Sequence, residues 1–97
     1  MKSFELQPRA DRELNKSAGF YEEQVPGLGD RFLDDFMALM RRLLDHPRSG
    51  AIVEDEIRVA RFRRFAYDVY YQIEETRLVV LAITDQRREP GSWKRDS

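Results

Sequence analysis

The sequence contains no cysteine and, among its 97 residues, only one histidine and one tryptophan. Without cysteine the chain has no disulfide framework, no thiolate metal site and no cysteine nucleophile, which fits a reducing cytoplasm. It also lacks an apolar run near the ~20 residues that a membrane helix needs. The first twenty residues carry charges throughout, so they lack the apolar core of a signal peptide. We therefore expect a cytoplasmic protein that makes no membrane contact.

Patterns for metal binding or conventional catalysis are also scarce. His46 precedes Pro47 at an expected helix end, where a capping role is the commoner one. The carboxylates show no clustered spacing that would hold a metal ion. Gly27 and Gly29 lack the strand–glycine–helix order and the lysine of a phosphate loop, and no serine has a nucleophile-elbow context. The sequence predicts no cofactor, no metal site and no conventional catalytic group.

The composition favours one globular domain over residues 1–97. Hydrophobic residues make up 41% and charged residues 36% of the chain, which is typical of a folded domain. The net charge of −1 is unevenly spread, because residues 1–57 carry 8 Lys and Arg against 12 Asp and Glu, whereas residues 58–95 carry 9 against 5. This asymmetry indicates either a basic face that meets a polyanion or an acidic partner, or two ordinary solvated faces of opposite sign.

The first half of the sequence predicts a short strand and a helical hairpin. Residues 3–6 form a short apolar run that is typical of an edge strand. Pro8 suits a first helical turn and Pro26 disfavours helical geometry before it, so we expect a helix over 8–24. A second helix should begin at residue 28 or 30 and end at Asp45. The apolar positions are Ala10, Leu14, Ala18 and Tyr21 in the first helix, and Leu28, Phe32, Phe36, Leu39 and Leu43, widened by Leu33, Met37, Met40 and Leu44, in the second.

After the hairpin, the period of the apolar residues changes from helical to alternating. We interpret residues 48–56 as a loop. Residues 57–62 and 67–73 alternate with a period of two, and residues 78–84 form a nearly continuous apolar run, typical of a central strand. The short connections imply an antiparallel meander, with the helices on one face. We therefore expect an α+β fold, in which an N-terminal helical hairpin packs on a small antiparallel β-sheet and a short turn or helix follows at 92–95.

Cationic side chains are concentrated around this meander. In an antiparallel arrangement the groups on its first and last strands converge at one end of the sheet, and guanidinium groups bind phosphates and carboxylates bidentately. Trp93 either stacks on a partner or packs over the sheet to anchor the chain end, and packing is the commoner role. The cations are Arg58, Arg61, Arg63 and Arg64 on or beside the first strand, and Arg87, Arg88, Lys94 and Arg95 after the last.

The order of these elements resembles the RelE/ParE superfamily of type II toxin–antitoxin toxins, in particular its ParE-like branch of plasmid stabilisation proteins. One departure is Ala66, which stands where the family usually has a proline before the strand tyrosine. The matching segments are A-D-R-E-L at 10–14, F-Y-E-E-Q-V-P-G-L-G-D-R-F at 20–32, H-P at 46–47, R-V-A-R-F-R-R-F-A-Y-D-V-Y-Y at 58–71, V-V-L-A-I at 79–83 and R-R-E-P-G-S-W-K-R at 87–95.

The resemblance implies a toxin that a cognate antitoxin, encoded beside it, holds inactive. We expect that partner to be small, with an acidic C-terminal segment, and to form a heterotetramer or a larger complex with the toxin. RelE-like members cut messenger RNA in the ribosomal A site, often with a tyrosine near the C-terminus, whereas ParE-like members inhibit DNA gyrase without being nucleases. No tyrosine follows Tyr71 here, and the terminal pattern around Trp93 is ParE-like.

Inhibition of DNA gyrase, without enzymatic activity, is therefore our first interpretation. One alternative is a ribosome-dependent mRNA endoribonuclease, in which Arg58, Arg61 and Arg88 hold the substrate phosphate. Another is a non-toxic remnant that keeps only antitoxin binding. The predicted target-binding residues are Arg58, Arg61, Arg64, Arg87, Arg88, Trp93 and Arg95.

Overall fold

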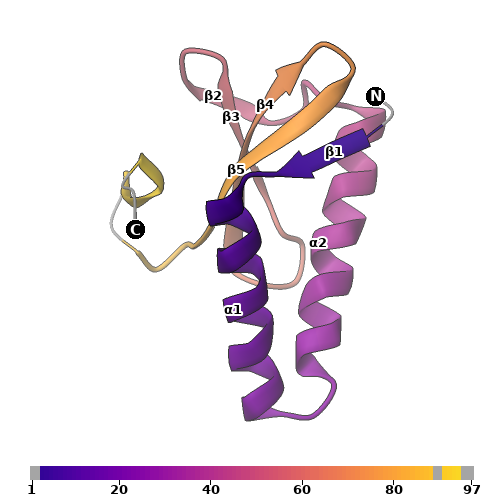
Figure 1. Ribbon diagram of the computed structural model, residues 1–97, viewed down its shortest axis with the longest axis vertical. Coiled ribbons are helices and arrows are strands. Elements are labelled where there is room, and N and C mark those ends of the chain that lie inside the picture. The colour runs from indigo at the N-terminus through magenta and orange to yellow at the C-terminus, as the bar shows by residue number, and fades with distance from the viewer. Residues whose placement is uncertain (1–2, 89–90, 95–97) are drawn as a thin grey trace.

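Two helices and five strands follow one another in the computed structural model, which describes residues 3–88 and 91–94 (Figure 1). The α+β class expected from the sequence is confirmed, as are the predicted bounds of both helices. The elements are β1 (Ser3–Leu6), α1 (Pro8–Gln24), α2 (Leu28–Asp45), β2 (Ala51–Glu54), β3 (Ile57–Arg61), β4 (Tyr67–Glu74), β5 (Arg77–Asp85) and a 3-10 turn, η1 (Ser92–Lys94).

The sheet is larger than the predicted meander, and it is mixed. Its strand order is β1-β5-β4-β3-β2, and β2 to β5 are antiparallel neighbours. β1 forms the other edge and runs parallel to β5, with Phe4 opposite Leu78 and Leu6 opposite Val80. Parallel neighbours need a long connection between them, and the helical hairpin with the three intervening strands supplies it.

The expectation of a loop over residues 48–56 is wrong at its centre, because Ala51–Glu54 forms the edge strand β2. All four residues of β2 are exposed, with Ile52 at 59% and Val53 at 44%. A strand without a buried face has no alternation of apolar and polar residues, so its sequence carries no period-two signal. The tight turn into β3 places Asp55 at a φ of 50°, a conformation that aspartate adopts more readily than most residues.

Glu22 closes the turn between the helices. Its carboxylate oxygens accept hydrogen bonds from the backbone N–H groups of Gly27 and Gly29, each at 3.0 Å, at the positive end of the α2 dipole. Gly27 has a φ of 89°, which favours glycine. A Cβ on Gly29 would lie 2.6 Å from the carbonyl oxygen of Ala18, so only glycine lets the two helices approach this closely.

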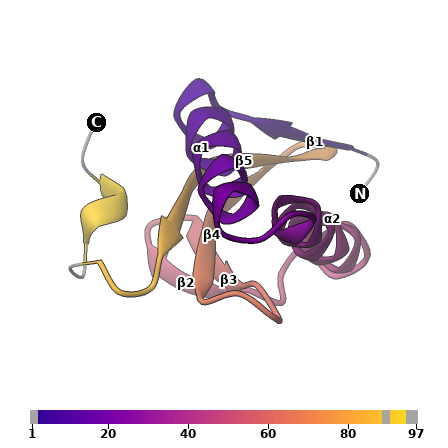
Figure 2. The same cartoon turned by 90° about the horizontal axis from the view of Figure 1, so that it is seen from below.

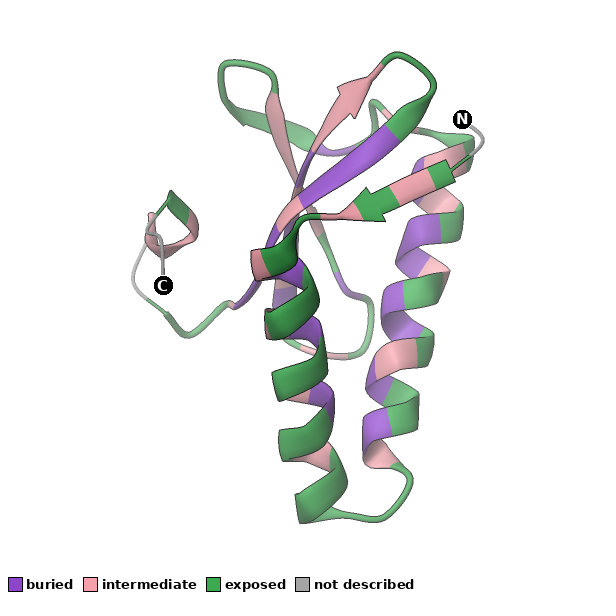
Figure 3. Cartoon of the chain, in the orientation of Figure 1, coloured by how far each residue is buried: buried purple, intermediate pink, exposed green. Residues whose placement is uncertain are grey.

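The core lies between the helical layer and the sheet, where the buried stretches of both face one another (Figure 3). Phe32 and Phe36 are 0% and 2% exposed, and the Phe32 ring centroid lies 5.1 Å from that of Phe62 and 4.9 Å from that of Tyr67. Met37, which was predicted to widen the apolar stripe of α2, is instead 39% exposed, because it lies on the side of the helix turned away from the core. The buried positions of β4 are those that the alternation predicts, namely Tyr67, Val69 and Tyr71.

Two buried polar groups fasten loops to this core. Asp35 is 6% exposed, and its Oδ2 accepts hydrogen bonds at 2.8 and 3.1 Å from the backbone N–H groups of residues 64–65, so the β3–β4 loop is held against α2. The Tyr71 hydroxyl donates to the carbonyl oxygen of Pro47 at 2.7 Å and accepts from the N–H of Gly50 at 3.1 Å. This second pair of bonds fixes the connection from α2 to β2.

Candidate functional site

Antiparallel pairing brings the ends of β3 and β5 to the same end of the sheet, because both strands run against β4. Arg61 ends β3, whereas Arg87 and Arg88 lie in the turn after β5. These three arginines therefore lie at the end of the sheet where the sequence predicts them. We refer to Arg87 and Arg88 together as the arginine arm.

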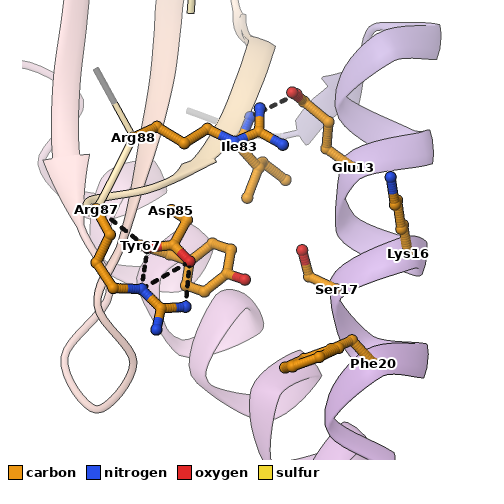
Figure 4. A pocket seen from close by; sticks show the side chains of 9 residues that line it. All are labelled: Glu13, Lys16, Ser17, Phe20, Tyr67, Ile83, Asp85, Arg87 and Arg88. Carbon is orange, nitrogen blue, oxygen red and sulfur yellow. Dashed lines mark hydrogen bonds and ion pairs between the residues drawn. The ribbon is translucent and has the colours of Figure 1, made fainter. Parts of the chain in front are cut away.

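A pocket of about 290 Å³ lies between α1 and the ends of β4 and β5, and the arginine arm forms part of its wall (Figure 4). Phe20 from α1, which is 52% exposed, and the side chains of Tyr67 and Ile83 from the sheet give the pocket an apolar lining. Glu13 also faces it, but its Oε1 accepts a hydrogen bond from the Ile83 N–H at 2.9 Å. The pocket thus combines an exposed aromatic ring with guanidinium groups.

Asp85 orients the first residue of the arginine arm. The backbone N–H of Arg87 donates to Asp85 Oδ1 at 2.9 Å, and Nε of the guanidinium donates to Oδ1 and Oδ2 at 3.0 and 3.1 Å. These bonds hold the pKa of the Asp85 carboxyl below its usual range and raise the pKa of Arg87. Arg88, by contrast, forms no ion pair with any residue of the described chain.

Tyr21, whose ring lies against that of the pocket-lining Tyr67, stays protonated over the physiological range. Burial, followed by a hydrogen bond with the Tyr67 side chain, raises the pKa of Tyr21 to about 12. A phenol of that pKa is a donor and not a base at neutral pH. The Tyr21 phenol is therefore a hydrogen-bond donor and not a proton acceptor beside this pocket.

Trp93 packs on the face of the sheet opposite the helices, where η1 lies (Figure 2). Its ring stacks on Tyr70 with centroids 4.6 Å apart and planes 13° apart. Arg9 donates from Nη1 to the carbonyl oxygen of Trp93 at 2.6 Å and from Nη2 to that of Ser92 at 3.2 Å, and Lys94 Nζ lies 2.8 Å from a carboxylate oxygen of β2. Of the two roles that the sequence left open for Trp93, the packing role is the one these contacts describe.

The other predicted target-binding residues have separate places. Arg58 donates from Nη1 to the carbonyl oxygens of Arg48 and Gly50, at 3.1 and 2.8 Å, so its guanidinium is engaged with the loop before β2. The Arg61 side chain is 78% exposed. Arg95 lies outside the described residues.

Arg64, one of the predicted target-binding residues, lies in a second cationic site, which sequence reasoning did not recognise as a separate site. It is a pocket of about 290 Å³ between α2 and the β3–β4 loop, with Asp34 and Asp35 among its lining residues. A signal was present, because Arg31 and Arg42 are about three helical turns apart and so share one side of α2. The arginines of this site, which we call the arginine pocket, are Arg31, Arg41, Arg42, Arg63 and Arg64.

Within residues 3–88 and 91–94, no group of three or more histidine, aspartate or glutamate side chains is placed to hold a metal ion. In the same part of the chain, neither helix has the length and apolar character that a bilayer span requires.

Comparison with known proteins relates the chain to a toxin family and to a solved toxin–antitoxin structure. The family model described as "ParE toxin of type II toxin-antitoxin system, parDE" matches residues 4–90. A solved chain from the "Chromosomal ParDE TA system from P. aeruginosa" superposes with a TM-score of 0.74 over 88% of this chain and 96% of that chain, at 16% sequence identity, so it shows a shared fold. No curated protein matches the sequence.

Proposed function

The chain belongs to the ParE toxin family of type II toxin–antitoxin systems, and on that premise we propose that it inhibits DNA gyrase and that a cognate antitoxin neutralises it. The resemblance to the ParE-like branch of the RelE/ParE superfamily is thereby confirmed. The gyrase target and the neutralisation are our proposals. We place the complex in the cytoplasm, as the composition suggests.

The observation that carries the gyrase proposal is the arginine arm beside an exposed aromatic ring. Asp85 holds Arg87 in one orientation, Arg88 has no carboxylate partner within the described chain, and Phe20 is 52% exposed on the facing helix. Arginine and aromatic side chains are enriched at protein–protein interfaces. A pre-oriented guanidinium also loses less side-chain entropy on binding. These features suit a surface that grips a target protein.

The chemistry of the same pocket favours binding over RNA cleavage. A general base works best with a pKa near the operating pH. The pKa of Asp85 is lowered by its hydrogen bonds to Arg87, the Glu13 carboxylate accepts a backbone hydrogen bond, and the pKa of Tyr21 is about 12. The pKa shifts of Asp85 and Tyr21 make both groups poor general bases at neutral pH, and for that reason the endoribonuclease is our second interpretation.

The proposal of neutralisation by an antitoxin also rests on the family to which the chain belongs. The solved chain with the shared fold belongs to a ParDE toxin–antitoxin system. We propose that this chain likewise binds a small antitoxin, whose acidic C-terminal segment is disordered when free and folds onto the toxin, in a heterotetramer or a larger complex.

The gyrase proposal is tested by inducing the chain alone in a bacterial host and following DNA and protein synthesis by pulse labelling. We expect DNA synthesis to stop first and the purified toxin to inhibit supercoiling by purified gyrase. If protein synthesis stops first, with messenger RNA cut at codon boundaries, the endoribonuclease interpretation replaces ours. If neither process slows, the chain is a non-toxic remnant.

The arginine arm is tested by the double reversal Arg87→Glu/Arg88→Glu. We expect growth arrest to weaken strongly while the fold is kept, because both side chains are on the surface. The matched control is Arg12→Glu/Arg48→Glu, which changes the net charge equally at two exposed arginines that do not line the pocket. Full growth arrest from a folded arm variant would contradict the role of the arm.

A further inference from the structure

The arginine pocket beside α2 gathers cations that have no counter-ion in the chain. Within residues 3–88 and 91–94, none of its five arginines forms an ion pair. Elsewhere, Arg9, Arg61, Arg77, Arg87 and Lys94 are each paired with a carboxylate. The guanidinium groups of the pocket are therefore available to an anion from outside the chain.

The two carboxylates of the pocket do not neutralise it. Asp35 is 6% exposed, and its Oδ2 accepts hydrogen bonds at 2.8 and 3.1 Å from the backbone N–H groups of Arg64 and Phe65. These bonds also hold the β3–β4 loop, which carries Arg63 and Arg64, beside α2. Asp34 is exposed and is the one carboxylate left facing the arginines. The pocket thus keeps a net positive charge on two elements that are fastened together.

The arginines are spread over a length that matches several phosphates of a DNA strand. Arg31 and Arg42 lie about three helical turns apart on one side of α2, which corresponds to about 16 Å at the helical rise. One DNA strand advances about 3.4 Å per phosphate along the duplex axis, so about five phosphates span that length. Guanidinium groups bind phosphate oxygens bidentately.

The net charge of −1 does not prevent contact with a polyanion, because the charges are separated in space. The exposed carboxylates of Asp55, Glu56 and Glu75 lie in the β2–β3 and β4–β5 turns, at the end of the antiparallel strands opposite the β3–β4 loop (Figure 1). The 8 residues of β4 separate the two ends by about 25 Å. Since salt screens surface charges beyond about 8 Å, the arginines dominate the field at the pocket.

The lining of the pocket suits phosphates better than unpaired bases or apolar side chains. Among the described residues that line it, Ala38 is the only apolar one and none is aromatic. Single-stranded nucleic acids bind largely by stacking their bases on aromatic rings, and protein partners typically meet at an apolar centre. Contact with the phosphates of a duplex needs neither feature.

We infer that the arginine pocket is a phosphate-binding site through which the toxin contacts the backbone of duplex DNA without reading its sequence. This inference goes beyond the proposed function, because its ligand is neither gyrase nor the antitoxin. It places the DNA contact on α2 and the β3–β4 loop, apart from the arginine arm beside α1. Only the link between this contact and gyrase, whose substrate is DNA, rests on the proposed function.

The test measures the binding of the purified toxin to a short labelled DNA duplex by fluorescence anisotropy, without gyrase or antitoxin. Arg31→Gln/Arg63→Gln changes one arginine on each side of the pocket, and Arg12→Gln/Arg48→Gln is the control that removes the same charge from exposed arginines outside it. At about 50 mM salt we expect the pocket pair to weaken binding about tenfold and the control pair less than about threefold. Duplexes of unrelated sequence should bind about equally.

The salt dependence supplies a readout that general damage to the fold would not imitate. Each phosphate contact contributes about −0.9 to the slope of log affinity against log salt concentration. The pocket pair should therefore make the slope shallower by about two units, whereas the control pair should leave it unchanged. Conversely, Asp34→Asn should tighten DNA binding about threefold, because it removes an exposed carboxylate from among the arginines.

Circular dichroism checks that each variant folds. If the pocket pair does not fold, Arg41→Gln takes its place, since Arg41 is exposed on α2, and the slope should then change by about one unit. The absence of duplex binding by the unmodified toxin at about 50 mM salt would overturn the inference. Equal affinities and slopes for the pocket and control pairs would do so too. A pocket pair that binds DNA normally but has lost affinity for the purified antitoxin would assign the pocket to an acidic protein instead. All three results leave the gyrase proposal standing, because inhibition of supercoiling is measured separately.

Discussion

Replacing Tyr71 with phenylalanine removes a single oxygen atom that holds the α2–β2 connection. That hydroxyl donates to Pro47 and accepts from Gly50, at 2.7 and 3.1 Å, from a side chain that is 0% exposed. The site leaves no room for another group, because a Cβ built on Gly50 would lie only 2.5 Å from the hydroxyl oxygen. Phenylalanine would therefore leave both backbone groups without their present partner.

The cost follows from how deeply each group is buried. The N–H of Gly50 is buried, so losing its acceptor should cost about 1–3 kcal/mol, the desolvation cost of an unpaired donor. Pro47 is only partly buried, and water can replace the lost donor, so its share should be about 0.5–1 kcal/mol. We expect Tyr71→Phe to lower the free energy of unfolding by about 2–3 kcal/mol.

Tyr70→Phe is the matched control. Tyr70 is the preceding residue of the same strand, and its hydroxyl makes no hydrogen bond to the described residues, whereas its ring keeps the stack on Trp93. Its removal should change stability by less than about 0.5 kcal/mol, as is usual for substitutions that break no buried contact. Urea unfolding measures both differences from the shift of the midpoint at a constant slope. Equal midpoints for the two variants would refute the assignment of an anchoring role to the Tyr71 hydroxyl.

Two further predictions concern the stability of the core and the loss of stability at alkaline pH. Phe32→Ala or Phe36→Ala should each lower the free energy of unfolding by about 3–5 kcal/mol, since both rings are buried, and a melting temperature within a degree or two of the unmodified protein would contradict their placement. Because the pKa of Tyr21 is raised to about 12 in the folded chain, the unfolded state loses this proton first, and stability present below about pH 10 should decline as the pH rises to about 12. Tyr21→Phe should remove about 1 kcal/mol of the loss between about pH 9 and pH 11, as measured by urea midpoints. Identical losses for both proteins would show that this phenol does not titrate as described.

The helices and the central strands could be predicted from the sequence because their signals are local. Pro8 and Pro26 bracket α1, and the alternation in β4 survives in the folded chain as a buried face. β2 could not be predicted, since a strand exposed on both faces has no alternation of apolar and polar residues. The parallel pairing of β1 was equally hidden, because its partner β5 is far along the chain.

The two candidate sites also differ in whether the sequence alone could reveal them. The arginine arm is contiguous in sequence, so composition alone pointed to it. The arginine pocket draws its cations from α2 and from the β3–β4 loop, which only the tertiary fold brings together. The roles of Arg58 and Tyr71 as anchors of the α2–β2 connection depend on single hydrogen bonds to backbone atoms, which no residue pattern encodes.

The pairing of β1 with β5 also has a consequence for how the chain is made. Contacts between segments so far apart form late and slow the folding of small domains. On the ribosome, the first strand leaves the exit tunnel long before its neighbour has been synthesised, so the helical hairpin must wait beside an incomplete sheet. The arginine arm lies one residue after the end of β5 and is translated after it. A chain that ends before β5 therefore lacks both the strand that completes the sheet and the basic surface, so the surface proposed to bind the target cannot form before the sheet is complete.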